Sequence, residues 1–331
     1  MPLGRISQYR DLRVAITGGL GCIGSTLARK LVAAGAQVTI VDCLLPQFGG
    51  NRFNIHDIAD QVQVQIADVR DEANLRNLVE KQDILFNLAG QTSHMDSMTD
   101  PYTDLDINVR AQLSVLEACR KFNPDIKIVF ASTRQIYGRP DYLPVDERHL
   151  LHPVDVNGVN KMAGEHFHIL YNNVYGIRAT ALRLTNTIGP GMRIKDARQT
   201  FLGVWIRALV EDRPFEVWGG EQLRDFTDVD DAASAFLLAG ISDVANGQVY
   251  NVGGPGVISL TNLAERLVRL HGRGSYQVKT FPADRARIDI GDYYADDTAI
   301  RTTLGWSPAM TLDATLHRTL TYYGEHLRHY L

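Results

Sequence analysis

A glycine-rich turn near the start of the chain constrains its fold more than any other segment. The turn reads TGGLGCIG, follows an apolar run over 12–16 and precedes a helical pattern over 25–34. Gly18 would permit the tight turn, Gly21 would let the backbone approach a pyrophosphate, and Gly24 would let the helix pack closely on the sheet. The helix N-terminus would offer free N–H groups to the anion. This order of elements predicts a cradle for a nucleotide phosphate.

An acidic residue at a suitable distance strengthens this interpretation. The next apolar run, 38–41, ends in Asp42, about twenty residues after the glycines, where a carboxylate would accept hydrogen bonds from an adenosine ribose. The charge of Asp42 would repel a 2′-phosphate, and no arginine follows it directly. We therefore expect NAD rather than NADP. The alternative is that the glycines and Asp42 form turns for structural reasons alone.

Strands and helices alternate through the first half of the chain, which predicts right-handed β-α-β units and a parallel sheet. The expected fold class is α/β, with a Rossmann-type doubly wound parallel sheet over 1–188 and parts of 225–255. A smaller C-terminal α/β lobe is expected over the remainder of 189–331. Further strands are expected at 62–67, 84–88, 126–131, 178–184 and 215–218. Further helices are expected at 71–80, 104–120, 158–175, 199–211, 230–241, 260–271 and 312–327.

Composition excludes several classes of function. The chain has 331 residues and a net charge of −4, so it carries no basic field for a nucleic-acid backbone. Residues 1–10 lack the apolar core of a signal peptide, and the longest apolar stretch, 232–241, is too short to span a bilayer. The three cysteines are scattered, and the histidines form no regular ligand set. We expect a cytoplasmic protein with no nucleic-acid partner, no membrane association and no metal.

Several motifs along nearly the whole chain resemble those of the extended short-chain dehydrogenase/reductase family, specifically its nucleotide-sugar epimerases and dehydratases. TGGLGCIG resembles the family's T-G-G-x-G-x-I-G, and FASTRQIYG over 130–138 resembles its active-site strand. RLTNTIGP over 183–190 resembles the R-x-x-N-x-x-G-P segment, and RDF over 224–226 resembles the R-D-F block. The resemblance implies bound NAD, a nucleotide-diphosphate sugar as substrate, an NAD-binding first domain and a sugar-nucleotide-binding lobe.

The resemblance also implies roles for individual residues. The cofactor-binding residues it implies are Gly18, Gly21, Cys22, Ile23, Gly24, Asp42, Asp68, Val69, Leu88, Ala89, Gly90, Gln91, Asn108 and Lys161. The substrate-binding residues are His94, Thr133, Asn186, Arg193, Arg224 and Arg287. The catalytic residues are Thr133, Asn157, Lys161 and Tyr137.

One segment departs from the family pattern at the catalytic position. The family carries Y-x-x-x-K at the start of a helix, where the lysine holds the nicotinamide ribose and the tyrosine takes a hydroxyl proton. This chain keeps Lys161 but has Asn157 at the tyrosine position. A neutral amide can hydrogen-bond a hydroxyl, yet it has no proton to exchange near neutral pH.

Three interpretations of this departure remain open. Another residue could serve as the base, and Tyr137, His94 and Asp96 are the nearest candidates by motif position. The reaction could instead be weak or lost, leaving a protein that binds NAD and a nucleotide sugar without turnover. The third interpretation is that the true tyrosine is shifted in the alignment. A dehydrogenase of small alcohols with exchangeable cofactor is a further class of function.

Two residues after Thr133 narrow the reaction. Dehydratases of the family have an Asp-Glu pair there, and decarboxylases keep a glutamate in this segment. Arg134 and Gln135 supply no carboxylate, which disfavours both reactions. Epimerisation needs only transient oxidation and return of hydride to the opposite face. We expect a 4-epimerase of a UDP-hexose because that is the commoner reaction, and a local resemblance to 2-epimerases of CDP-deoxysugars gives the alternative. The family also predicts a homodimer through the helices at 104–120 and 158–175.

Overall fold

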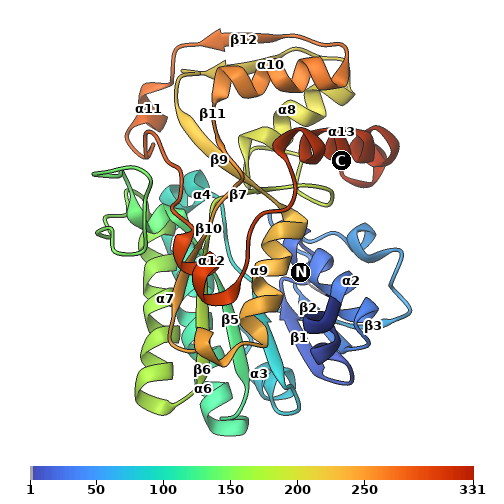
Figure 1. The fold of residues 1–331 in the computed structure, drawn as a ribbon, viewed down its shortest axis with the longest axis vertical. Helices are drawn as coiled ribbons and strands as arrows, with labels where there is room; N and C mark the ends of the chain where they lie inside the picture. The colour runs from blue at the N-terminus through green and yellow to red at the C-terminus, as the bar shows by residue number, and fades with distance from the viewer. Residues whose placement is uncertain (1–2) are drawn as a thin grey trace.

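The computed structural model describes residues 3–331 and is built around a seven-stranded parallel sheet (Figure 1). Its strand order is β10-β6-β5-β4-β1-β2-β3, so the chain starts near the middle and winds outward in both directions. The strands are β1 (Arg13–Thr17), β2 (Gln37–Asp42), β3 (Val62–Ile66), β4 (Ile84–Asn87), β5 (Lys127–Thr133), β6 (Arg178–Leu184) and β10 (Val249–Val252). The predicted doubly wound α/β fold is confirmed.

Helices cover both faces of the sheet, because successive strand residues point to opposite sides. In β1, Val14 and Ile16 pack in one core cluster with Phe236, whereas Ala15 packs in another with Leu116. The first cluster lies under α2 (Cys22–Ala33) and α9 (Val229–Gly240). The second lies under α3 (Glu72–Val79), α6 (Ala111–Phe122) and α7 (Val156–Tyr175).

A smaller lobe lies above the parallel sheet in Figure 1. The chain enters it from the carboxyl end of β6, through β7 (Asn186–Ile188), which pairs with β9 (Leu223–Asp228). The lobe has its own core, in which Trp205, Leu263 and Leu316 are buried together. Its other elements are β8 (Phe215–Trp218), β11 (Val257–Ser259), β12 (Tyr276–Lys279), α8 (Phe201–Val210), α10 (Leu260–His271) and α13 (Leu312–His326).

The structure differs from the expected elements at two places that matter for the site. The helix expected at 104–120 is α5 (Pro101–Leu105) followed by a π-helical turn, Asp106–Arg110, and then α6. A short helix that was not expected, α4 (His94–Thr99), begins at a serine cap, Ser93, whose Oγ accepts from the Asp96 amide. Within residues 3–331, no helix is long and apolar enough to cross a membrane.

A buried histidine on α7 gives a first prediction, on stability. The Nδ1 atom of His168 donates to the Gly164 carbonyl (2.7 Å), so its Nε2 accepts from Asn87 (3.2 Å). Burial lowers the pKa of His168 to about 4. The unfolded chain therefore binds more protons between pH 6.5 and 4, and acidification through this window should cost on the order of 3 kcal/mol of stability.

The test of this prediction is urea unfolding at pH 7, 5.5 and 4.5. His168→Gln should lose stability less steeply on acidification than the wild type does. His166→Gln, which changes an exposed histidine of the same helix, should keep the wild-type pH dependence. An equal slope in His168→Gln and the wild type would contradict the assignment.

Candidate functional site

The glycine turn between β1 and α2 has the geometry that a pyrophosphate requires. Gly18 has a positive φ of 66°, and a Cβ there would lie 3.0 Å from the Ala89 nitrogen. A Cβ at Gly24 would lie 2.4 Å from the Gly18 oxygen, so the helix packs directly on the turn. Gly21 caps α2 without any side-chain hydrogen bond. The first-turn N–H groups therefore remain available to an anion.

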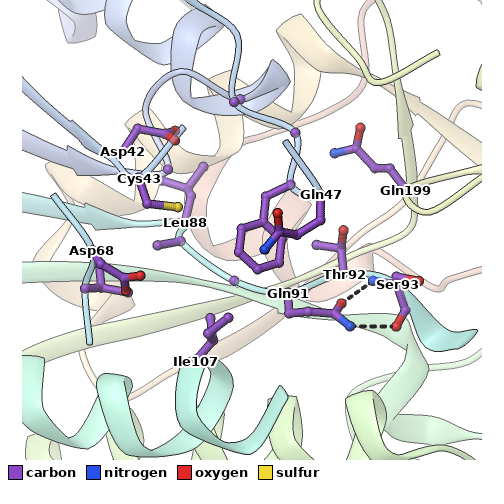
Figure 2. Close-up of a pocket in the computed structure, with 18 of the residues that line it drawn as sticks. Asp42, Cys43, Gln47, Asp68, Leu88, Gln91, Thr92, Ser93, Ile107 and Gln199 are labelled. Carbon is purple, nitrogen blue, oxygen red and sulfur yellow. Dashed lines mark hydrogen bonds between the residues drawn. The ribbon is translucent and has the colours of Figure 1, made fainter. Parts of the chain in front are cut away.

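A cavity opens over this turn, and we name it the glycine-turn cavity. In Figure 2, Asp42 and Asp68 lie at one end, Gln91, Thr92 and Ser93 lie toward the other, and Gln199 reaches in from the small lobe. The expected cofactor residues that line it are Gly18, Gly21, Asp42, Asp68, Val69, Leu88, Ala89, Gly90 and Gln91. Those outside its lining are Cys22, Ile23, Gly24, Asn108 and Lys161.

The carboxylate of Asp42 is fixed in the cavity wall by backbone amides. Its oxygens accept from Leu20 N (3.1 Å) and Leu44 N (3.0 Å). Burial raises the pKa of Asp42, and these two amides oppose that rise. At the same end of the cavity, Asp68 is paired with Arg70 at 2.6 Å. The arrangement suits recognition of a ribose by Asp42, since a rigid carboxylate presents fixed acceptors.

Lys161 lies beside strand β5 and is buried. Its Nζ donates to the Ala131 carbonyl (2.6 Å) and lies 4.5 Å from the centre of the Phe130 ring. Burial lowers the pKa of Lys161 to about 8, against the opposing effect of Asp104 and Glu165. A Cβ at Gly90, which lines the cavity, would lie 3.5 Å from Lys161 Nζ, so the ammonium group lies directly behind the cavity wall.

Asn157 is turned into a buried polar network. Its Nδ2 donates to the Gln91 carbonyl (2.8 Å) and to Asp104 (3.0 Å). Asp104 also accepts from Asn108 (3.1 Å) and Asn160 (2.8 Å). Asn157 lines neither the glycine-turn cavity nor the second cavity that adjoins it. Its placement does not support the expected contact with a reacting hydroxyl.

The two other residues expected at the chemical step also lie outside the cavity linings. Tyr137 is fully buried, donates to Asn251 (2.7 Å) and accepts from Arg183 (2.7 Å). Burial raises its pKa well above the ordinary value. Thr133 accepts from the Gln135 amide (3.2 Å) at the end of β5. The placement of Tyr137 gives no support to a role as base.

A second cavity adjoins the first, and we name it the arginine-lined cavity. The two share Ser93, Arg198 and Gln199 in their linings. Aromatic side chains of the small lobe form an apolar wall. The cationic side chains that line it are Arg134, Arg198, Arg213, Arg224 and Arg285, and the carboxylates are Glu216 and Asp289.

Two buried donors in this cavity lack partners among the described residues. Arg134 donates to Asn186 (3.1 Å) from one Nη atom, while its other Nη atom and the Asn186 Nδ2 are buried without a hydrogen bond. Burial, together with the nearby charge of Arg134, lowers the pKa of Arg224 to about 10. Unpaired buried donors are costly, so this site suits an oxygen-rich anion.

The remaining residues that were expected to bind substrate do not lie together in one cavity. His94, Asn186 and Arg224 line the arginine-lined cavity. Arg193 lines the glycine-turn cavity and pairs with Asp196 at 2.6 Å. Arg287 is exposed and lines neither cavity.

Sequence reasoning missed several residues of the site. Arg198 and Gln199 follow an irregular stretch with no motif, so nothing in the sequence places them where the cavities meet. From the sequence, Arg134 is notable only because it stands where dehydratases of the family have a carboxylate. Asp155 could have been found, because an aspartate directly before a helical pattern is a common N-cap, and it does cap α7.

Known proteins resemble this chain over almost its whole length. The model of the NAD dependent epimerase/dehydratase family matches residues 14–253. A putative UDP-glucose 4-epimerase of Methanocaldococcus jannaschii is 31% identical over 318 residues, which is 93% of this chain and 97% of that protein. UDP-glucose 4-epimerase of Thermotoga maritima, solved with UDP-glucose, is 26% identical with a TM-score of 0.86, covering 96% of this chain and 100% of that one. UDP-glucose 4-epimerase of Thermus thermophilus, solved with NAD, is 25% identical with a TM-score of 0.83, covering 94% and 99%.

Proposed function

Because this chain belongs to the NAD-dependent epimerase/dehydratase family, we propose that it is a nucleotide-sugar 4-epimerase acting on a UDP-hexose. NAD is the cofactor of this family. The observation that carries the proposal is the meeting of two cavities at Ser93, Arg198 and Gln199. The glycine-turn cavity has the glycine turn that a dinucleotide requires, and the arginine-lined cavity has buried cationic side chains that suit an anion.

The glycine-turn cavity fits NAD. The amides at the start of α2 would hold the pyrophosphate, Asp42 would hold the adenosine ribose, and Lys161 would hold the nicotinamide ribose. Bound NAD would accept a hydride from a sugar carbon and later return it. The chain's own residues must then position the sugar and move the hydroxyl proton.

The arginine-lined cavity fits the diphosphate of the sugar nucleotide. Arg224 and Arg134 would donate to phosphate oxygens, and Asn186 would donate its unpaired Nδ2. With its pKa at about 10, Arg224 keeps its charge at neutral pH. The aromatic wall leaves an apolar surface for a base or sugar ring.

Epimerisation is favoured over dehydration by the carboxylates of the cavity. Glu216 accepts from the Trp218 indole (3.2 Å), and Asp289 lies 3.4 Å from Arg224. Neither carboxylate directly follows Thr133 in sequence, and among the described lining residues both already have partners. Dehydration would need a further proton donor and acceptor beside the sugar ring, in addition to the group that exchanges the hydroxyl proton.

We also propose a homodimer through the helix pair expected from the family. Helices α6 and α7 carry five exposed apolar side chains, Phe122, Val159, Leu170, Val174 and Tyr175. Two of them, Phe122 and Tyr175, each lie under an arginine side chain.

The experiment is incubation of the purified protein with UDP-glucose, UDP-galactose, their N-acetyl and uronate forms, and CDP- and dTDP-sugars, followed by proton NMR of the products. We expect interconversion of a UDP-hexose and its 4-epimer without net accumulation of NADH. A 2-epimer from a CDP-sugar would replace the reaction assigned here, and loss of water would indicate a dehydratase. Absence of turnover despite bound NAD would favour the binding-protein class, which the placement of Asn157 motivates.

A further inference from the structure

A sugar epimerase of this kind needs a group that accepts and returns a hydroxyl proton. Asn157 cannot exchange a proton, and its amide is held by Gln91 and Asp104. Tyr137 is fully buried, with its hydroxyl held by Asn251 and Arg183. The residue that acts as base must therefore come from elsewhere in the cavity lining.

A histidine and an aspartate stand beside the start of α7. The Nδ1 atom of His94 lies 2.9 Å from Oδ2 of Asp155. Asp155 is buried, and its other oxygen accepts from the Gly158 amide (2.6 Å) as the helix N-cap. Gln135 Nε2 donates to the same Oδ2 atom (2.9 Å). The aspartate is thus fixed by the helix cap and by Gln135, while His94 is 38% exposed and lines the arginine-lined cavity.

His94 is also adjacent to the position that the usual tyrosine would occupy. It is the first residue of α4, and Ser97 of that helix donates to the His94 carbonyl (2.7 Å). The same Ser97 hydroxyl accepts from the backbone amide of Asn157 (3.2 Å). The neighbouring Ser93 lines both cavities. His94, a lining residue of the arginine-lined cavity, therefore directly follows a residue at which the two cavities meet.

We propose that the His94–Asp155 pair replaces the tyrosine as the acid/base of the reaction, a role that rests on the proposed function. Asp155 holds the proton on Nδ1 and leaves Nε2 as the acceptor. His94 Nε2 would take the proton of the sugar hydroxyl, and bound NAD would supply the acceptor for the hydride that leaves the same carbon, so that a carbonyl forms. Return of the hydride to the opposite face and of the proton to the oxygen restores the hydroxyl and neutral His94.

The pair is at ion-pair distance but lacks the alignment of a hydrogen bond. Catalytic hydrogen bonds commonly tighten when substrate binds. Burial raises the pKa of Asp155, but His94, Gly158 and Gln135 outweigh it, so the pKa lies below the ordinary value. The aspartate therefore stays ionised and would stabilise the imidazolium.

Charged side chains surround His94. Asp155 faces it from the start of α7, and Asp96 of its own helix is paired with Arg198 at 2.9 Å. The other charged groups lining the cavity are Arg134, Arg213, Arg224, Arg285, Glu216 and Asp289.

The test compares His94→Gln, Asp155→Asn and the control His317→Gln, an exposed histidine on α13. His94→Gln should lower kcat about 100- to 1,000-fold with a much smaller change in KM and in the melting temperature. Asp155→Asn keeps a capping side chain. NMR of 15N-labelled histidine should show that the His94 ring of this variant has lost the wild-type preference for a proton on Nδ1. His317→Gln should match the wild type in every measurement.

The dyad is overturned if His94→Gln keeps kcat within about three-fold of wild type, or if Asp155→Asn leaves the tautomer of His94 unchanged. In either case the epimerase assignment stands, because the wild type still converts its substrate. A wild-type protein that converts no nucleotide sugar overturns the proposed function, and the acid/base role of the dyad with it.

Discussion

Replacing Gly24 with valine is expected to lower the affinity for NAD by more than about 100-fold, a loss of roughly 2.7 kcal/mol of binding free energy. A Cβ at Gly24 would lie 2.4 Å from the Gly18 oxygen and 2.6 Å from the Gly19 Cα. Both obstacles are backbone atoms of the turn, so α2 must move away from the turn or the turn must open. Either movement displaces the helix N-terminus from the pyrophosphate. Isothermal titration of the cofactor-free protein with NAD measures the effect.

A matched substitution separates this effect from the cost of a β-branched residue in a helix. Gly324 lies in α13, and a Cβ there meets nothing within 4 Å. Gly324→Val should therefore bind NAD with wild-type affinity. Overpacking at Gly24 should also lower the free energy of unfolding by about 1–3 kcal/mol, which urea unfolding measures. Binding of NAD by Gly24→Val within about three-fold of wild type would show that the turn is not the cradle.

The glycine turn could be predicted from sequence because its chemistry is local. About thirty consecutive residues contain the whole pattern: a glycine at positive φ, a helix that packs on the turn, and an acidic residue at the end of the next strand. Gly18, Gly24 and Asp42 lie as that pattern requires. The parallel sheet could be predicted for the same reason, because each β-α-β unit is a short segment whose hydrophobic periodicity indicates its strands and helix.

The chemical centre could not be predicted in this way, because its contacts join distant segments. Asn157 meets Gln91 and Asp104, and His94 meets Asp155 across 61 positions of the chain. A motif gives the residue type at a position but not the direction of its side chain. Asn157 stands at the tyrosine position, yet its amide faces the buried network around Asp104. Arg198 and Gln199 belong to the loop before α8, which begins at Phe201 and not at the expected position 199. In such a loop periodicity does not indicate where a side chain lies.

Replacing Asp104 with alanine is expected to lower the free energy of unfolding by on the order of 3–5 kcal/mol. Asp104 is fully buried and accepts from the side-chain amides of Asn108, Asn157 and Asn160. Its loss leaves buried donors without an acceptor, which costs more than the bonds themselves contribute. Urea unfolding gives the value. Asp106→Asn is the control, since this partly exposed residue of the π-helical turn accepts none of these bonds, and it should cost less than about 0.5 kcal/mol.

A double-mutant cycle with Asn157 then tests which way that side chain faces. If the amide of Asn157 is held by Asp104, the cost of Asn157→Ala falls when Asp104 is already alanine, because the bond is lost only once. A coupling of about 1 kcal/mol or more is expected for residues in one buried network. If instead the two costs add within about 0.5 kcal/mol, Asn157 is free of the network. The Asn157 side chain could then face the substrate. The need for a base elsewhere would in that case rest only on the inability of an amide to exchange a proton, and not on where Asn157 lies.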